Sequence, residues 1–277
     1  MISDNYIDSI DGCTVHYLSK GNGRPVIFIS GWMGTATTFI PVVSKIPDSY
    51  QCLILDIPGF GLSTPFKKIP HTLANYCHML DDFIKKLNLK DPVLVGVSFG
   101  ATLMIQYTED INPNISKIVL QSPVYKPFSI TGYGKFLLKI FYNMKSAGEF
   151  ILRSTRFDFM KNVIYIFGDQ NMKATSLKDI KEYGLKTLYM SDIPAIFQSM
   201  EDILQIDLRP KLNNIRSKVL LIYGNRENMF PEEYQQELAG LIPNCNFVQM
   251  KGATHYAMMQ MSNEFTKYLV DFINIQP

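Results

Sequence analysis

Short, almost wholly apolar runs alternate along the chain with longer segments in which apolar residues recur roughly every three or four positions. The short runs are rich in β-branched residues and end at turn residues. They predict strands at residues 14–18, 26–30, 52–56, 93–97, 117–121, 219–223 and 247–250. The longer segments predict helices at residues 73–87, 101–109 and 265–273. Strands that alternate with helices indicate an α/β fold, and strands with so few polar positions are typical of a mostly parallel sheet covered on both faces.

One region departs from this alternation. Residues 124–208 have helical periodicity and no convincing strand, and the core pattern resumes from Pro210. We therefore expect a core made by residues 1–123 and 209–277, with residues 124–208 inserted as a helical cap. The first part of the insertion, residues 124–161, carries a local charge of +5, because it contains seven basic residues and only two acidic ones, Glu149 and Asp158. The basic residues are Lys126, Lys135, Lys139, Lys145, Arg153, Arg156 and Lys161.

Composition narrows the class of protein. The chain has 277 residues, of which 47% are hydrophobic and 19% charged, so it has enough apolar material for a large core. Its net charge of +2 gives no global reason to expect nucleic-acid binding. The longest uncharged run, residues 25–44, contains Gly31, Gly34 and Pro41 and is a poor membrane span. The first eight residues lack the basic start of a secretory signal, so we expect a cytoplasmic protein.

The four cysteines lie far apart in the chain, at Cys13, Cys52, Cys77 and Cys245. None belongs to a C-x-x-C pair, which disfavours both a zinc site and a redox pair. We expect reduced thiols in the core, and neither a metal nor an organic cofactor.

A candidate nucleophile follows the apolar run at residues 93–97. The sequence Gly96-Val97-Ser98-Phe99-Gly100 lies between a predicted strand and a predicted helix. A serine at such a tight turn is held in strained backbone with its hydroxyl clear of the sheet, and the two glycines relieve clashes with neighbouring elements. The five-residue pattern also arises by chance, and Ser98 would then only cap the helix. Other residues must decide between these interpretations.

A serine hydroxyl needs a base to become an effective nucleophile at neutral pH, and histidine is the usual one. Of the four histidines, only His255 lies in a loop beyond the end of a predicted strand, where ligands gather in open α/β sheets. His16, His71 and His78 are more simply explained as packing or surface residues. His255 is therefore the candidate base.

The base in turn needs a carboxylate to orient it. Glu227 comes just after the predicted strand at residues 219–223, and the chain order Ser98, Glu227, His255 is that of serine, acid and histidine in a known class of hydrolases. Asp207, near the end of the insertion, is a competing candidate. The choice between Glu227 and Asp207 stays open at this point.

With these residues in view, the chain resembles the α/β-hydrolase fold family of serine hydrolases with a helical cap. The resemblance rests on blocks that occur in family order: Ser30-Gly31-Trp32-Met33-Gly34, residues 56–63, the Ser98 turn, Gly224-Asn225-Arg226-Glu227 and Gly252-Ala253-Thr254-His255. It implies an eight-stranded sheet, an oxyanion hole formed by the backbone N–H groups of Trp32 and Phe99, and a structural role for the turn that begins at Asp56. Two positions differ from the usual family pattern, because Ser30 stands where the family commonly has histidine and Glu227 where it commonly has aspartate.

The resemblance also implies an activity. Epoxide hydrolases and haloalkane dehalogenases of this fold use aspartate at the position of Ser98, so hydrolysis of a carboxylic ester through an acyl-enzyme is the expected reaction. Among family members, the Gly31-Trp32 pair and the basic, aromatic insertion are similar to the pimeloyl-acyl-carrier-protein methyl ester esterases of biotin synthesis. A small acyl ester, linked or not to an acyl carrier protein, is then the expected partner.

Other interpretations remain open at this stage. The basic residues of the insertion equally fit a solvated helix face or a contact with anionic lipid. A carbon–carbon bond hydrolase of the same fold would use the same three residue types. A receptor on this fold that turns over slowly or not at all belongs to a different functional class, although retention of both Ser98 and His255 argues against it.

Overall fold

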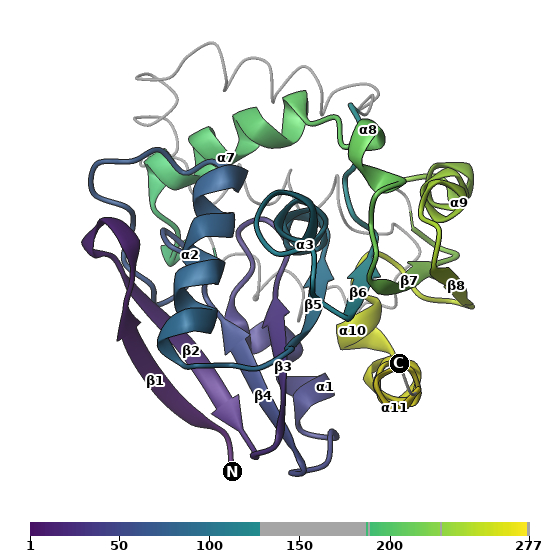
Figure 1. Ribbon diagram of the computed structural model, residues 1–277, viewed down its shortest axis with the longest axis horizontal. Coiled ribbons are helices and arrows are strands. Elements are labelled where there is room, and N and C mark those ends of the chain that lie inside the picture. Colours follow the sequence, from purple (N-terminus) through teal and green to yellow (C-terminus); the bar gives the residue numbers. More distant parts are fainter. Residues whose placement is uncertain (128–186, 188, 228, 276–277) are drawn as a thin grey trace.

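The computed structural model describes residues 1–127, 187, 189–227 and 229–275, and its centre is one sheet of eight strands (Figure 1). The strands are β1 (Ser3–Asp8), β2 (Thr14–Lys20), β3 (Arg24–Ile29), β4 (Tyr50–Leu55), β5 (Val93–Val97), β6 (Lys117–Gln121), β7 (Lys218–Gly224) and β8 (Cys245–Met250). Their order is β1-β2-β4-β3-β5-β6-β7-β8. The β1–β2 and β2–β4 pairs are antiparallel and all the other pairs are parallel. The predicted fold class is confirmed.

Helices cover both faces of this sheet (Figure 1). On one face lie α2 (Leu73–Lys86), α3 (Phe99–Asp110), α8 (Arg209–Leu212) and α9 (Glu232–Leu241). Helix α7 (Ile193–Gln205) packs onto the same core but runs across the top of the view, beyond the strands (Figure 1). On the other face lie α1 (Ile40–Val43), α10 (Ala257–Gln260) and α11 (Ser262–Asn274). Two short 3-10 turns, η1 (Ile10–Gly12) and η2 (Ala36–Phe39), complete the described elements. None of the helices in these residues is long and apolar enough to cross a bilayer.

Alternation along the strands divides the buried side chains between two cores. In β3, Ile27 and Ile29 pack with the α2–α3 side, whereas Val26 and Phe28 pack with α1 and α11. Because successive side chains of a strand point to opposite faces, a strand covered by helices on both sides must be apolar at nearly every position. This explains why the central strands have almost no polar positions.

The strand that the pattern did not predict is β1. Its sequence, SDNYID, is mostly polar and mostly exposed, and it pairs only with β2 at the edge of the sheet. An edge strand buries little surface, so its residues carry no apolar signal of the kind that marks the central strands.

The predicted cap is described only in part. Of residues 124–208, the structure describes 124–127, 187 and 189–208, and these include α7. The ends of the insertion meet, because Leu208 N–H donates to the Tyr125 carbonyl at 2.7 Å. Of the seven basic residues at 124–161, Lys126 forms an ion pair with Glu237, and the other six lie outside the described residues. The boundaries proposed for the cap stay a prediction.

The cysteines are free thiols in apolar surroundings. Cys13, Cys52 and Cys77 are buried and Cys245 is half-buried. Burial raises the pKa of Cys13 to about 11 and of Cys52 and Cys245 to about 12. Such thiols stay protonated at neutral pH and behave as small apolar side chains.

Candidate active site

Ser98 occupies the sharp turn between β5 and α3. Its backbone has φ 50° and ψ −116°, a conformation that non-glycine residues adopt rarely and at an energetic cost. The flanking glycines are required by close packing. A Cβ on Gly96 would lie 2.5 Å from the backbone of Gly100 and Ala101, and one on Gly100 would lie 2.3 Å from the Ile29 carbonyl oxygen. The predicted reason for glycine at both positions is therefore correct.

The helix that follows directs its N-terminus at the same turn. Phe99 is the first residue of α3, so its N–H belongs to the first turn, where helical N–H groups have no partner within the helix. The Ser98 carbonyl accepts the first helical hydrogen bond from Thr102 N–H, at 2.9 Å. The positive end of the helix dipole therefore lies beside Ser98, where it favours negative charge.

A second loop, residues 30–36, passes directly beside Ser98. A Cβ on Gly31 would lie 3.2 Å from the Ser98 Cβ. The loop is closed tightly, since Gly34 N–H donates to the Gly31 carbonyl at 2.8 Å and Met33 has φ 58°. Ser30 stands at the position where histidine is common. Its hydroxyl donates a hydrogen bond to the Thr35 carbonyl at 2.9 Å and so joins the two ends of the loop.

Trp32, the next residue of this loop, links it to the predicted cap. Its indole N–H donates to the Ser199 hydroxyl of α7 at 3.0 Å. Ser199 is fully buried and donates in turn to the Ala195 carbonyl of the same helix at 2.6 Å. A movement of α7 would therefore be transmitted to the loop that contacts Ser98.

His255 and Glu227 form a buried pair. The His255 Nδ1–H donates to Glu227 Oε2 at 2.6 Å, and the two side chains are 8% and 0% exposed. The other carboxylate oxygen, Oε1, accepts the Met229 N–H at 3.0 Å. In a neutral imidazole with the proton on Nδ1, Nε2 is an acceptor. The pair therefore holds His255 in the tautomer that can take a proton.

The loops that carry this pair are joined to each other. Arg226 N–H donates to the Ala253 carbonyl at 2.8 Å, and Gly252 N–H donates to the Asn225 side chain at 2.6 Å. A Cβ on Gly224 would lie 2.4 Å from the Ala253 carbonyl oxygen, so glycine is required for the close approach. The two loops are therefore held close together, and Glu227 reaches His255 across this contact.

One residue that sequence analysis did not single out joins Ser98 to His255. The Gln121 carbonyl accepts Ser98 N–H at 2.8 Å, and the Gln121 side-chain amide donates to the His255 carbonyl at 2.8 Å. Gln121 is fully buried at the end of β6, between the strands that precede Ser98 and Glu227. A polar residue that directly follows the apolar run at residues 118–120 was the signal available in the sequence.

Asp207, the competing acid, lies in a different setting. It accepts hydrogen bonds from Arg209 Nε at 2.9 Å and Nη2 at 2.5 Å, in an exposed ion pair. Hydrogen bonding to Arg209 lowers the pKa of the Asp207 carboxyl. The carboxylate that contacts His255 is Glu227.

The remaining histidines have separate surroundings. His71 is buried with Nδ1 3.0 Å from the Tyr76 hydroxyl, and burial lowers its pKa, so it is neutral at neutral pH. His78 is exposed on α2. His16 is buried as well, but it is paired with Asp56 at 2.7 Å, which the sequence did not indicate.

The chain is similar in sequence and in fold to several known proteins. A family model described as alpha/beta hydrolase fold matches residues 24–180, more than half of the chain. The chain is 24% identical over 264 residues to the dihydrolipoyllysine-residue acetyltransferase component of the acetoin cleaving system of Cupriavidus necator, covering 94% of this chain and 66% of that protein's length. It is 24% identical to the pimeloyl-[acyl-carrier protein] methyl ester esterase of Shewanella oneidensis, covering 94% of each. Among solved structures, the esterase from Exiguobacterium antarcticum is similar, with a TM-score of 0.83, 18% identity and coverage of 98% of this chain and 99% of that chain.

Proposed function

Because the chain belongs to the alpha/beta hydrolase fold family, we propose that it is a serine hydrolase that cleaves carboxylic esters. Ser98 is the nucleophile, His255 the general base and acid, and Glu227 the residue that orients His255. The observation that carries this proposal is the buried 2.6 Å hydrogen bond between His255 Nδ1 and Glu227 Oε2, because it leaves Nε2 ready to accept the serine proton.

The first half-reaction transfers the acyl group to the enzyme. Ser98 Oγ attacks the ester carbonyl carbon while His255 Nε2 takes the hydroxyl proton. The carbonyl π electrons move to the oxygen, and the N–H groups of Trp32 and Phe99 stabilise that negative charge. When the tetrahedral intermediate collapses, the bond to the leaving alcohol breaks and His255 gives its proton to that alcohol. An acyl-Ser98 ester remains.

The second half-reaction returns the enzyme to its starting state. A water molecule attacks the acyl-Ser98 carbonyl, and His255 takes one of its protons. The second tetrahedral intermediate collapses to the carboxylic acid, and His255 returns the proton to Ser98 Oγ. Water is consumed and no other reactant is needed. The positive end of α3 lies beside Ser98 and so favours the negative charge of both tetrahedral intermediates.

The substrate we propose is a small acyl ester. An acyl carrier protein that presents the acyl group is a finer version of this proposal, and the similarity to a pimeloyl-[acyl-carrier protein] methyl ester esterase supports it. Lys126 adds little free positive charge for such a carrier, because Glu237 already pairs with it. A panel of methyl, aryl and carrier-linked acyl esters separates the two versions, since only the second requires faster turnover of the carrier-linked ester than of the matching small ester.

The test of the mechanism compares two buried serines. Ser98 and Ser122 both follow a central strand, both have positive φ and both are less than a tenth exposed. Ser98→Ala should abolish hydrolysis of p-nitrophenyl esters and covalent labelling by a fluorophosphonate, whereas Ser122→Ala should retain both. Ester hydrolysis by the Ser98→Ala variant at the wild-type rate would overturn the proposal. Cleavage of a vinylogous diketone without cleavage of any ester would favour a carbon–carbon bond hydrolase, and labelling without turnover would favour a binding protein.

A further inference from the structure

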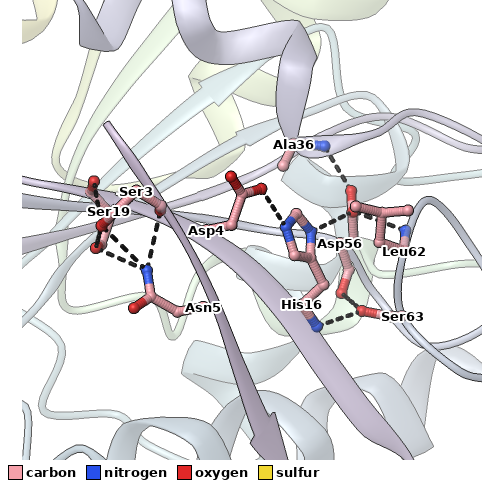
Figure 2. Close-up of polar contacts among 9 residues, drawn as sticks. All are labelled: Ser3, Asp4, Asn5, His16, Ser19, Ala36, Asp56, Leu62 and Ser63. Carbon is pink, nitrogen blue, oxygen red and sulfur yellow. Dashed lines mark hydrogen bonds and ion pairs between the residues drawn. The ribbon is translucent and has the colours of Figure 1, made fainter. Parts of the chain in front are cut away.

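An array of three charged groups, two of them buried, lies where β1 and β2 meet the turn after β4 (Figure 2). The His16 ring lies between two carboxylates, with Nδ1 2.7 Å from Asp56 Oδ2 and Nε2 3.1 Å from Asp4 Oδ1. His16 is 3% exposed and Asp56 is 2% exposed, whereas the Asp4 side chain is 68% exposed. We call Asp4, His16 and Asp56 the carboxylate–histidine array.

In addition to its contact with His16, the Asp56 carboxylate accepts hydrogen bonds from two backbone amides. Its Oδ1 accepts Ala36 N–H at 2.5 Å and its Oδ2 accepts Leu62 N–H at 2.9 Å (Figure 2). A Cβ on Gly61, which has φ 60°, would lie 2.2–2.4 Å from the Asp56 carboxyl group, so the turn wraps tightly around it. One buried carboxylate therefore joins three separate segments: β2, the turn of residues 56–63 and the loop of residues 30–36.

The amide that Asp56 holds closes the loop beside Ser98. Ala36 follows Thr35, whose carbonyl the Ser30 hydroxyl already holds at 2.9 Å. At the other end of this loop, Gly31 lies against Ser98. The two hydrogen bonds fix adjacent backbone groups at the far end of a tight turn, so they determine where the Trp32 N–H can lie relative to Ser98.

The array is complete only when His16 is protonated. Both of its ring nitrogens face carboxylate oxygens, which accept hydrogen bonds and donate none, so both nitrogens must carry a proton. Burial opposes this charge, but the hydrogen bonds to Asp56 and Asp4 outweigh burial and raise the pKa of His16 above 6.5. The imidazolium also compensates the buried charge of Asp56, which would otherwise be costly.

The surroundings of His16 define what else acts on its charge. Asp4 and Tyr6 face it from β1, where the Tyr6 ring centroid lies 5.0 Å away, and Asp56 faces it from the turn after β4. The His16 backbone is held as well: Ser63 Oγ accepts its N–H at 2.8 Å, and its carbonyl accepts Asp56 N–H at 3.0 Å. The ring is thus fixed between its two carboxylates.

We propose that the carboxylate–histidine array is a positioning device for the oxyanion loop, and that its imidazolium form is the one that places the Trp32 N–H for catalysis. The inference rests on the proposed function, since it requires that the Trp32 N–H stabilise the oxyanion. Asp4, His16 and Asp56 touch no reacting atom and act only through the loop of residues 30–36.

An oxyanion donor acts mainly in the transition state, so a displaced donor lowers kcat more than it changes KM. Complete loss of one donor costs about 10²–10³ in kcat. Because Asp56→Asn displaces the loop rather than deleting the donor, we expect a fall in kcat of about tenfold or more, with KM within about twofold. In wild type, kcat should decrease as pH rises through the pKa of His16.

The experiment measures kcat and KM for a p-nitrophenyl ester against pH in wild type and four variants. Asp56→Asn should lower kcat at all pH values. His16→Gln should lower kcat and abolish the alkaline decrease, and Asp4→Asn should move that decrease to lower pH. Asp11→Asn is the matched control, because Asp11 also holds backbone amides, those of residues 67–69, but none in the loop of residues 30–36. It should keep the wild-type profile.

The outcomes separate two kinds of failure. If Asp56→Asn and His16→Gln lower the melting temperature but leave kcat and the alkaline decrease as they are in Asp11→Asn, the array is structural and the inference is wrong. Should either variant fail to fold, Asp4→Asn still decides, because Asp4 is exposed and an unmoved alkaline decrease in that variant also contradicts the inference. Failure of the proposed function shows differently, as activity that survives Ser98→Ala.

Discussion

The side-chain amide of Gln121 donates a 2.8 Å hydrogen bond to the main-chain carbonyl of His255. The main-chain carbonyl of Gln121 accepts a hydrogen bond from Ser98 N–H. The proposed nucleophile and the proposed base lie 157 residues apart in the sequence, as 255 minus 98, yet they are joined through one buried glutamine. Correct alignment of Ser98 with His255 therefore depends on the end of β6.

Replacement of Gln121 by methionine should impair catalysis without loss of the fold. The variant leaves the His255 carbonyl without its donor, at a cost of about 1–3 kcal/mol, and loosens the base relative to Ser98. We expect kcat to fall by about tenfold. Gln235→Met is the matched control, because Gln235 is equally buried and its amide donates to the Pro123 carbonyl instead. Equal losses of kcat in both variants would show that any buried glutamine near β6 has this effect.

Removal of the charge of Glu227 should have a much larger effect than removal of that of Asp207. Glu227→Gln deprives His255 of the carboxylate that orients it, so kcat for a p-nitrophenyl ester should fall by roughly 10³–10⁴. Asp207→Asn breaks only an exposed ion pair with Arg209, and turnover should stay near that of wild type. A severe loss in Asp207→Asn alone would make Asp207 the acid.

A methyl group should be tolerated at one glycine and excluded at another. Gly100→Ala would place its Cβ 2.3 Å from the Ile29 carbonyl oxygen, and we expect a loss of about 1–3 kcal/mol or more in the free energy of unfolding. Gly240→Ala, in α9, has no atom within 4 Å of the added Cβ and should stabilise by roughly 0.5–1 kcal/mol. Urea denaturation measures both. Equal stabilities would contradict the packing of the Ser98 turn.

Trp32 is the sole tryptophan of the chain, so its fluorescence reports directly on the loop beside Ser98. Ser199→Ala removes the acceptor of its indole N–H, and the emission maximum should shift. We expect kcat to fall by about twofold to tenfold, since a single neutral hydrogen bond contributes about 0.5–1.5 kcal/mol. Ser199→Thr, which keeps the hydroxyl, should restore both. An unchanged emission spectrum in Ser199→Ala would show that Trp32 does not depend on α7.

The stability of the fold should decrease on the alkaline side through His16. Burial opposes the imidazolium, but hydrogen bonds to Asp56 and Asp4 raise the pKa of His16 in the folded state above 6.5. The folded protein therefore binds this proton more tightly than the unfolded chain does. The resulting stability is fully present below about pH 6.5 and is lost as pH rises through the folded pKa. Urea unfolding from about pH 6 to pH 9 should show this decrease, which should be weaker in His16→Gln.

The sequence was a good guide wherever one residue type carried the signal. Apolar runs located the central strands, and the glycines around Ser98 indicated the turn before α3. Glu227 and His255 could be proposed because each lies in the loop after a predicted strand, β7 and β8 respectively. The pairing of His16 with Asp56 could not, because it joins residues 40 apart whose meeting depends on the order of the strands in the sheet. Gln121 was missed for the same reason, since its partners Ser98 and His255 lie in the loops after two other strands, β5 and β8.

The hydrogen bonds between the loops after β7 and β8 have a mechanical consequence. Arg226 is hydrogen-bonded to Ala253, and Gly252 to Asn225, so the two loops that carry Glu227 and His255 form one hydrogen-bonded unit. A strain applied to either strand displaces both side chains together and leaves their separation intact. Misalignment would then arise between this unit and Ser98. In directed evolution of this protein, the most sensitive positions should therefore lie where the unit meets the Ser98 turn.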